Sequence, residues 1–368
     1  MKRVLIISIF VWYAPLFASF TSTAPIMTLP SNAYELSRGH SAKLTGVEAM
    51  AINPAATAEP YPGYHYSWDG LVTYQKLPAS ISYLNASFVY QVSPTVGTFG
   101  ISFAHLNYGR FDGVDANGIS TGSISAYEIM GILNYARPLF GRWTIGGNVR
   151  LLYDKLDQVT ATGVGFDAGM KGQMLVMRNF LWLSVSGTGF GPGIKFERQA
   201  SPLPAKFNAA LTYELKSFLP KWMNFSFGPS GEYWLEKILV VGGGAKLSLY
   251  FGRFKWFLMG RYLSGLALNG IAFGTGVAQE MPSFTWKIDG SYQPMGILGN
   301  NIMISARFSK PFGSIGPKKL APVNKPLLLE DPLAENPLDE STLNERGEKI
   351  VKAHKHKKHK KHKKRRKK

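Results

Sequence analysis

A two-residue alternation of apolar and ionisable side chains is the feature that most constrains the fold of this chain. In residues 143–154, one parity holds Trp143, Ile145, Gly147, Val149, Leu151 and Tyr153, and the other holds Thr144, Gly146, Asn148, Arg150, Leu152 and Asp154. Successive side chains of a β-strand point to opposite faces of the sheet. We therefore predict a strand with one apolar face and one face that carries all of its charge.

Residues 159–174, 283–293 and 300–312 repeat the pattern. Their ionised side chains at one parity are Asp167, Lys171, Lys287, Asp289 and Arg307, with apolar residues at the other. Two architectures give such alternation. A membrane barrel turns the apolar face to lipid, whereas a soluble sandwich buries that face and exposes the charged one. Alternation alone leaves both open.

The N-terminus favours the membrane barrel. Met1-Lys2-Arg3 precedes an apolar run over residues 4–20, which is the layout of a secretory signal peptide. We assign residues 1–24 to it and leave the cut open between Ala18 and Ala24. An uncleaved anchor is the alternative, although Pro15 interrupts the run and a spanning helix needs about 20 residues. No later stretch reaches the roughly 18 apolar residues of a transmembrane helix, so a mature membrane protein would span with strands.

Strand-like runs fill residues 63–312. They are 64–75, 79–92, 95–109, 122–137, 140–156, 159–174, 180–190, 204–216, 222–234, 238–252, 254–264, 270–280, 283–293 and 300–312. Single-chain bacterial barrels have an even number of strands, which returns both ends to the periplasm. The chain has no cysteine, so disulfides and thiolate metal sites are excluded. We predict an all-β fold, a transmembrane antiparallel barrel of about 14 strands.

The flanking segments lack this pattern. Residues 25–62 are rich in Pro, Ala and Ser, with at most one helical turn near residues 42–50. Residues 313–353 form a Pro-punctuated, acidic linker. Eleven of the 42 Lys and Arg residues lie in residues 354–368, so the rest of the chain has 31 basic and 23 acidic residues, a net charge of +8.

The basic tail, residues 354–368, is expected to stay disordered until it meets a polyanion. Its cations are Lys355, Lys357, Lys358, Lys360, Lys361, Lys363, Lys364, Arg365, Arg366, Lys367 and Lys368. Export conflicts with nucleic-acid binding, so we expect the partner to be an anionic cell-envelope polymer in the periplasm.

No catalytic or metal-binding pattern stands out. Only His40, His65 and His105 lie outside the tail, and none belongs to a serine-elbow or paired-histidine motif. Glycine clusters at residues 187–191, 242–244 and 274–276 lack the helix of a dinucleotide loop, which favours kinks within strands. We predict a protein that is not an enzyme and needs neither cofactor nor metal.

Parity assigns eight ionisable residues to the barrel lumen. They are Glu128, Arg150, Asp154, Asp167, Lys171, Lys287, Asp289 and Arg307. Two roles are open for them. They can form cross-strand pairs that fill a narrow interior, or they can line a path for cargo.

Residues 106–118 (LNYGRFDGVDANG) and 121–128 (TGSISAYE) resemble the PorV/PorQ family of FadL-like outer-membrane barrels. Ser37-Arg38 and Asn53-Pro54-Ala55 resemble the N-terminal signature of that family, and the likeness covers residues 33–312. The chain departs from the family at Ala56, where glycine is usual, and lacks its Gly-Gly-Ala run and acidic pair. The basic tail has no counterpart there.

The resemblance implies a barrel of fourteen strands whose N-terminal segment plugs the lumen. The implied plug or hatch residues are Ser37, Arg38, Asn53, Pro54 and Ala55. Relatives take up hydrophobic molecules, or serve type IX secretion by holding exported proteins at the cell surface. We therefore expect passive transport of a hydrophobic small molecule across a Gram-negative outer membrane. The alternatives are an accessory role in protein secretion with a secreted-protein partner, and a soluble periplasmic β-protein.

Overall fold

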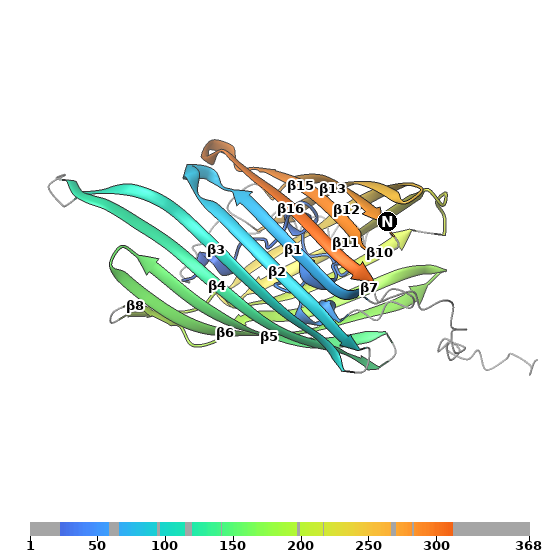
Figure 1. Cartoon of the computed structure of the whole chain (residues 1–368), viewed down its shortest axis with the longest axis horizontal. Helices are drawn as coiled ribbons and strands as arrows, with labels where there is room; N and C mark the ends of the chain where they lie inside the picture. Colours follow the sequence, from blue (N-terminus) through green and yellow to red (C-terminus); the bar gives the residue numbers. More distant parts are fainter. Residues whose placement is uncertain are drawn as a thin grey trace, which may run out of the picture. The chain divides into compact units, whose positions relative to one another are not determined.

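The strands whose side chains alternate in the sequence form a closed ring (Figure 1). The structure is a computed structural model that describes residues 23–58, 66–93, 96–114, 120–140, 142–196, 199–215, 217–265, 270–281 and 283–311. The strands of the ring are β1 (Tyr66–Lys76), β2 (Ser82–Ser93), β3 (Gly97–Val114), β4 (Ser120–Phe140), β5 (Trp143–Leu156), β6 (Val159–Val176), β7 (Asn179–Phe190), β10 (Lys206–Leu215), β11 (Met223–Trp234), β12 (Ile238–Phe251), β13 (Phe254–Ser264), β14 (Ala272–Glu280), β15 (Thr285–Pro294) and β16 (Asn300–Pro311).

Closure comes from the pairing of the first strand with the last. Thr73 of β1 lies opposite Asn85 of β2 on one side and opposite Ser305 of β16 on the other. All neighbouring strands are antiparallel, and both ends of the sheet are paired, so the ring has no edge in need of protection. The predicted all-β antiparallel barrel of fourteen strands is confirmed. Among the described residues, no helix is long and apolar enough to cross a membrane.

Several strand boundaries differ from the predictions. β3 and β4 form a longer hairpin than predicted because pairing resumes after a register shift between Asn107 and Arg110, next to Gly109 with its φ of 83°. A short hairpin of β8 (Ile194–Phe196) and β9 (Gln199–Ser201) occupies a link predicted to have no strand. Its strands span three residues each, too short for alternation to reveal.

The two faces of the ring differ in chemistry. In β5, Val149 and Leu151 are exposed on the outer face, whereas Asn148, Arg150 and Leu152 are buried on the inner face. Large apolar side chains are likewise exposed on the outside of the other strands, for example Phe103, Leu133, Leu258 and Ile304. Such an outer face is unfavourable in water, and in a membrane it faces lipid.

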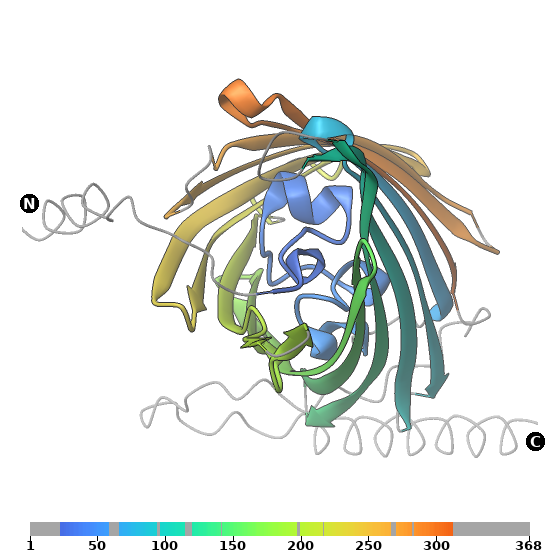
Figure 2. The same cartoon turned by 90° about the vertical axis from the view of Figure 1, so that its left-hand side faces the viewer.

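Residues 23–58, here called the inner segment, lie within the ring (Figure 2). They form short elements: η1 (Pro25–Met27), α2 (Ala33–Arg38), η2 (Gly46–Glu48) and η3 (Pro54–Thr57). Asn32 and Asn53 cap α2 and η3, accepting hydrogen bonds from the backbone N–H groups of Glu35 and Ala55. The predicted turn near residues 42–50 contains η2. The helix α2 was not predicted, because six residues are too few to show a helical period.

The core of the molecule lies between the inner segment and the wall. Ile26, Val47 and Met50 pack with Leu71, Tyr83 and Ile132 of the strands. A second cluster joins Tyr34, Leu44 and Ile52 to Phe257 and Met259. The end of the barrel where β1 begins and β16 ends is called the terminal end below, and the other is the opposite end. Thr23 binds the carbonyl oxygen of Pro202 at the opposite end, so the inner segment starts there.

Candidate functional site

An ion-pair network holds the inner segment at the closure seam, the pairing of β1 with β16 that closes the ring. Glu48 of η2 accepts hydrogen bonds from Lys287 of β15 and, at 2.6 Å, from Arg307 of β16. Arg307 also binds both carboxylate oxygens of Asp69 in β1. Asp289 lies 3.2 Å from the Lys287 ammonium. All of these charges are buried or nearly so, and each has an opposite charge in contact, as buried ions require.

This network controls the protonation of Glu48. Burial by itself raises the pKa of this carboxyl, but Lys287 and Arg307 outweigh that effect and lower the pKa to about 2. Burial also raises the pKa of Tyr34 in α2. The lumen therefore holds Glu48 as an anion over the whole physiological range.

Asn53 and Pro54 attach the other side of the inner segment to β5, β6 and β7. The Asn53 side-chain amide donates to the carbonyl oxygen of Met170 at 3.0 Å and to the hydroxyl of Ser184 at 2.7 Å. The wall offers no side chain at Gly169, where a Cβ would overlap the side chain of Asn53. Gly169 therefore leaves space for Asn53 at the start of η3. Ala55 in η3 is fully buried.

Ser37 and Arg38 end α2 against β12 and β14. Ser37 donates back to the carbonyl oxygen of Ala33 at 2.8 Å. A Cβ at Gly244 would overlap the carbonyl oxygen of Arg38. The sequence favoured a strand kink for the glycine cluster 242–244. Gly244 has a further role, because the absence of a side chain there leaves space for α2.

Elsewhere along the lumen, wall side chains bind the backbone of the inner segment. Glu128 accepts from the N–H of Ile26 at 2.9 Å, and Arg150 donates to the carbonyl oxygen of Ala51 at 2.6 Å. Lys171 donates to the carbonyl oxygen of Leu44 at 2.7 Å. These wall groups satisfy backbone polar groups that the short elements leave unpaired.

The remaining predicted residues support these contacts. Asp167 pairs with Arg150 at 2.8 Å and accepts from the N–H of Gly189. Asp154 lies directly across from Glu128 on the neighbouring strand. The structure thus places all eight lumen residues on the inner face. Five of them, Glu128, Arg150, Lys171, Lys287 and Arg307, contact the inner segment directly, and Asp167 and Asp289 pair with one of those five. The basic-tail residues and the linker lie outside the described residues, as do residues 1–22 of the predicted signal peptide.

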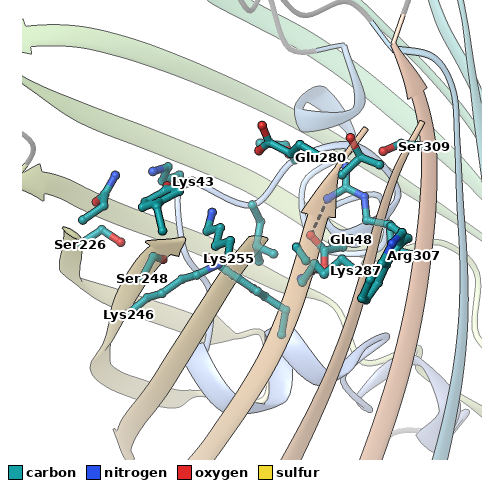
Figure 3. Close-up of a pocket in the computed structure, with 18 residues that line it drawn as sticks. Lys43, Glu48, Ser226, Lys246, Ser248, Lys255, Glu280, Lys287, Arg307 and Ser309 are labelled. Carbon is teal, nitrogen blue, oxygen red and sulfur yellow. Dashed lines mark hydrogen bonds and ion pairs between the residues drawn. The ribbon is translucent and has the colours of Figure 1, made fainter. Parts of the chain in front are cut away.

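A polar cavity of about 170 Å³ lies at the terminal end, between the inner segment and strands β11 to β16 (Figure 3). Its charged lining consists of Lys43, Glu48, Lys246, Lys255, Glu280, Lys287 and Arg307. Ser226, Ser248, Thr285 and Ser309 add hydroxyl groups. Two other cavities are far smaller, at about 20 and 10 Å³.

Sequence reasoning missed Glu48, Asp69, Lys246 and Lys255. Asp69, Lys246 and Lys255 lie on strands, where alternation of side chains could have assigned them to the lumen. Lys255 precedes the outward Trp256, and Lys246 alternates with Leu247 and Leu249. Glu48 gives no such signal, because it lies in a segment without a period and its partner Arg307 is 259 residues away.

No family profile and no curated protein matches the sequence. Solved structures do match. The toluene transporter TodX of Pseudomonas putida superposes with a TM-score of 0.53 at 12% identity, over 77% of this chain and 98% of that chain. The barrel has a TodX-like fold.

Two further structures have lower TM-scores. The toluene transporter TbuX of Ralstonia pickettii reaches 0.48 at 14% identity, over 79% of this chain and 99% of that chain. A FadL homologue of Pseudomonas aeruginosa reaches 0.47 at 9% identity, over 77% and 98%. At such identities the likeness to TodX concerns the fold alone, and the resemblance to PorV/PorQ stays a prediction.

Proposed function

We propose that the protein is a FadL-like outer-membrane barrel through which a small hydrophobic molecule crosses passively, without catalysis. Three observations support this. The ring is closed, its outer face is apolar, and its lumen is polar and occupied by the chain's own N-terminal segment. The similar structure TodX is a toluene transporter, which suggests an aromatic or other hydrophobic cargo.

The lengths of the links between strands suggest which end faces the cell. At the terminal end they are residues 94–96, 141–142, 177–178, 216–222, 252–253 and 281–284, and at the opposite end 77–81, 115–119, 157–158, 191–205, 235–237, 265–271 and 295–299. Bacterial barrels have short periplasmic turns and longer extracellular loops. We therefore assign the terminal end to the periplasm and the opposite end to the cell exterior.

The proposal that the inner segment acts as a plug rests on how the segment is attached to the wall. Its elements are short, and individual hydrogen bonds, one ion-pair network and two apolar clusters join them to the wall. Hydrogen bonds of this kind exchange with water at a small net cost, typically about 1 kcal/mol each. None of these contacts replaces the strand pairing that holds the ring, so a shift of the segment would leave that pairing in place.

Two measurements test this function. Cells that produce the protein in an intact outer membrane should take up labelled toluene faster than cells that produce an unrelated barrel. In planar bilayers, deletion of residues 33–58 should raise ion conductance above that of the full chain. Equal toluene uptake would reject the transport role, and unchanged conductance would reject the plug.

An accessory role in protein secretion predicts a different result. Detergent extraction of native membranes should then recover a stoichiometric partner protein, and toluene uptake should not change. A soluble periplasmic protein would instead be released by salt or alkali washing without detergent.

A further inference from the structure

The lining of the cavity at the terminal end includes five cations and two carboxylates. Lys287 and Arg307 are held by Glu48, Asp69 and Asp289. Lys43 is paired with Glu214, with 2.6 Å between the ammonium nitrogen and Oε1. These three cations therefore already have partners within the protein.

Lys246 and Lys255 differ from them. Among the described residues, neither ammonium has a carboxylate within the 4.0 Å limit of an ion pair, although Glu280 lines the same cavity. Aromatic rings hold both instead. The Lys246 nitrogen lies 4.4 Å from the ring centre of Tyr34 and 4.1 Å from that of Phe257, and the Lys255 nitrogen lies 5.1 Å from that of Tyr250. Ring faces position an ammonium but leave its charge uncompensated.

A buried guanidinium, that of Arg38, lies behind the cavity. Arg38 is 2% exposed, and its Nη1 donates to the hydroxyl of Ser226 at 3.0 Å. Its Nε and Nη2 have no hydrogen-bond partner within the described part of the chain. A buried, incompletely bonded cation is costly, and a nearby anion would reduce that cost.

Hydroxyl groups complete the chemistry of the cavity. Ser226 accepts from Arg38, so its own hydrogen is available to donate toward the cavity. Figure 3 shows Lys43, Lys246 and Lys255 on one side of the cavity, and Glu48, Lys287 and Arg307 on the other. The unpaired charge is thus gathered on the side that Ser226 and Ser248 also line.

We propose that this cavity binds a small oxyanion, a carboxylate or a phosphate, between the ammonium groups of Lys246 and Lys255. Charge-assisted hydrogen bonds from two ammonium groups and a hydroxyl are the donor set that such a group accepts. The volume of about 170 Å³ equals several water molecules of roughly 30 Å³ each, so a single phosphate or a compact carboxylate fits. The site does not depend on the transport proposal, because it concerns binding at one end of the lumen.

Calorimetric titration of the full-length protein in neutral detergent and chloride buffer tests the site. The probes are inorganic phosphate and benzoate, with benzyl alcohol as the uncharged counterpart of benzoate. We expect saturable binding of at least one of the two anions, weakened by added salt, and none of the alcohol. Phosphate alone would identify a site for free or headgroup phosphate, and benzoate alone would identify an organic carboxylate.

The variants separate this site from general attraction to a basic protein. Lys246→Met with Lys255→Met keeps most of the side-chain length and should weaken anion binding at least tenfold. Lys195→Met, which removes an exposed charge from β8, should leave binding unchanged. If the double variant does not assemble, Lys255→Gln alone should still weaken binding severalfold. Absence of saturable anion binding, equal binding of benzyl alcohol, or undiminished binding in the lysine variants would each overturn the proposal.

Discussion

Arg307 binds Asp69 through two parallel hydrogen bonds, from Nε to Oδ1 at 2.8 Å and from Nη2 to Oδ2 at 2.7 Å, across the seam between β16 and β1. Its third nitrogen, Nη1, binds Glu48 at 2.6 Å. One guanidinium therefore joins the first strand, the last strand and the inner segment. Such bidentate geometry is specific to arginine, so lysine would not replace it.

We expect Arg307→Met to destabilise the protein strongly. The substitution leaves Asp69 and Glu48 buried with less compensating charge, and removal of one partner of a buried pair costs roughly 3–5 kcal/mol. Thermal unfolding in detergent should shift down, and limited proteolysis should cut the inner segment sooner. Arg110→Met is the matched control, because Arg110 is an exposed cation near the opposite end. Equal unfolding of both variants would contradict the role of the seam.

Acid should weaken the same attachment. The pKa of Glu48 in the folded protein is about 2, below the roughly 4.3 of a free glutamate. Glu48 therefore stabilises the fold fully above about pH 5, and this contribution disappears as pH falls through the folded-state pKa of about 2. At about 1.4 kcal/mol per pKa unit the loss is roughly 3 kcal/mol. Unfolding measured from pH 5 to 2 should decline less steeply in Glu48→Gln, and parallel profiles would show that Glu48 is not the titrating group.

The glycine beneath Asn53 provides a test that changes no charge. Gly169→Val places side-chain atoms where the Asn53 side chain lies, and such overpacking costs about 1–3 kcal/mol. We expect lower stability and earlier proteolysis within residues 53–58. Gly131→Val is the control, because the nearest atom to a Cβ there is 4.0 Å away. Neither glycine has a left-handed backbone, so the two variants differ in available space.

The ring could be predicted because its signal is local. A residue such as Arg150 is assigned to the inner face by its immediate neighbours alone, since strand side chains alternate. Strand ends were less predictable where a bulge shifts the register, as beyond Asn107 in β3. Side chains still alternate beyond the bulge. The one extra residue in β3, however, switches which of the even-numbered and odd-numbered residues face the lumen.

The attachment of the inner segment could not be derived from periodicity. The segment has none, because its polar backbone groups bind wall side chains such as Arg150 and Lys171 instead of forming long elements. Its docking residues Asn53 and Arg38 came from the family resemblance. The pairing of Glu48 with Arg307 depends on where the segment lies once the ring has closed.

The predicted signal peptide, residues 1–24, includes two residues that make contacts at the opposite end. The backbone N–H of Thr23 donates to the carbonyl oxygen of Pro202 at 3.1 Å, and Ala24 is 1% exposed. A cut after Ala24 would remove both residues from their contacts, whereas a cut after Ala18 keeps them. We predict that the mature protein begins at Ser19. Intact-mass measurement of protein from outer membranes checks this, and a mature chain that begins at Pro25 would disprove it.

The basic tail, residues 354–368, gives the last prediction. In the proposed orientation the terminal end faces the periplasm, so the chain beyond β16 would enter the compartment that holds the anionic polymers of the cell wall. Its eleven cations should bind these polymers with strong salt dependence, because the Debye length is about 8 Å at physiological ionic strength. The four histidines of the tail should add charge as pH falls through roughly 6.5, which strengthens the contact. Removal of residues 354–368 should therefore leave barrel assembly intact and reduce co-sedimentation with isolated cell wall at low salt. If the truncated and full-length proteins are retained equally across a salt series, the tail has no such role.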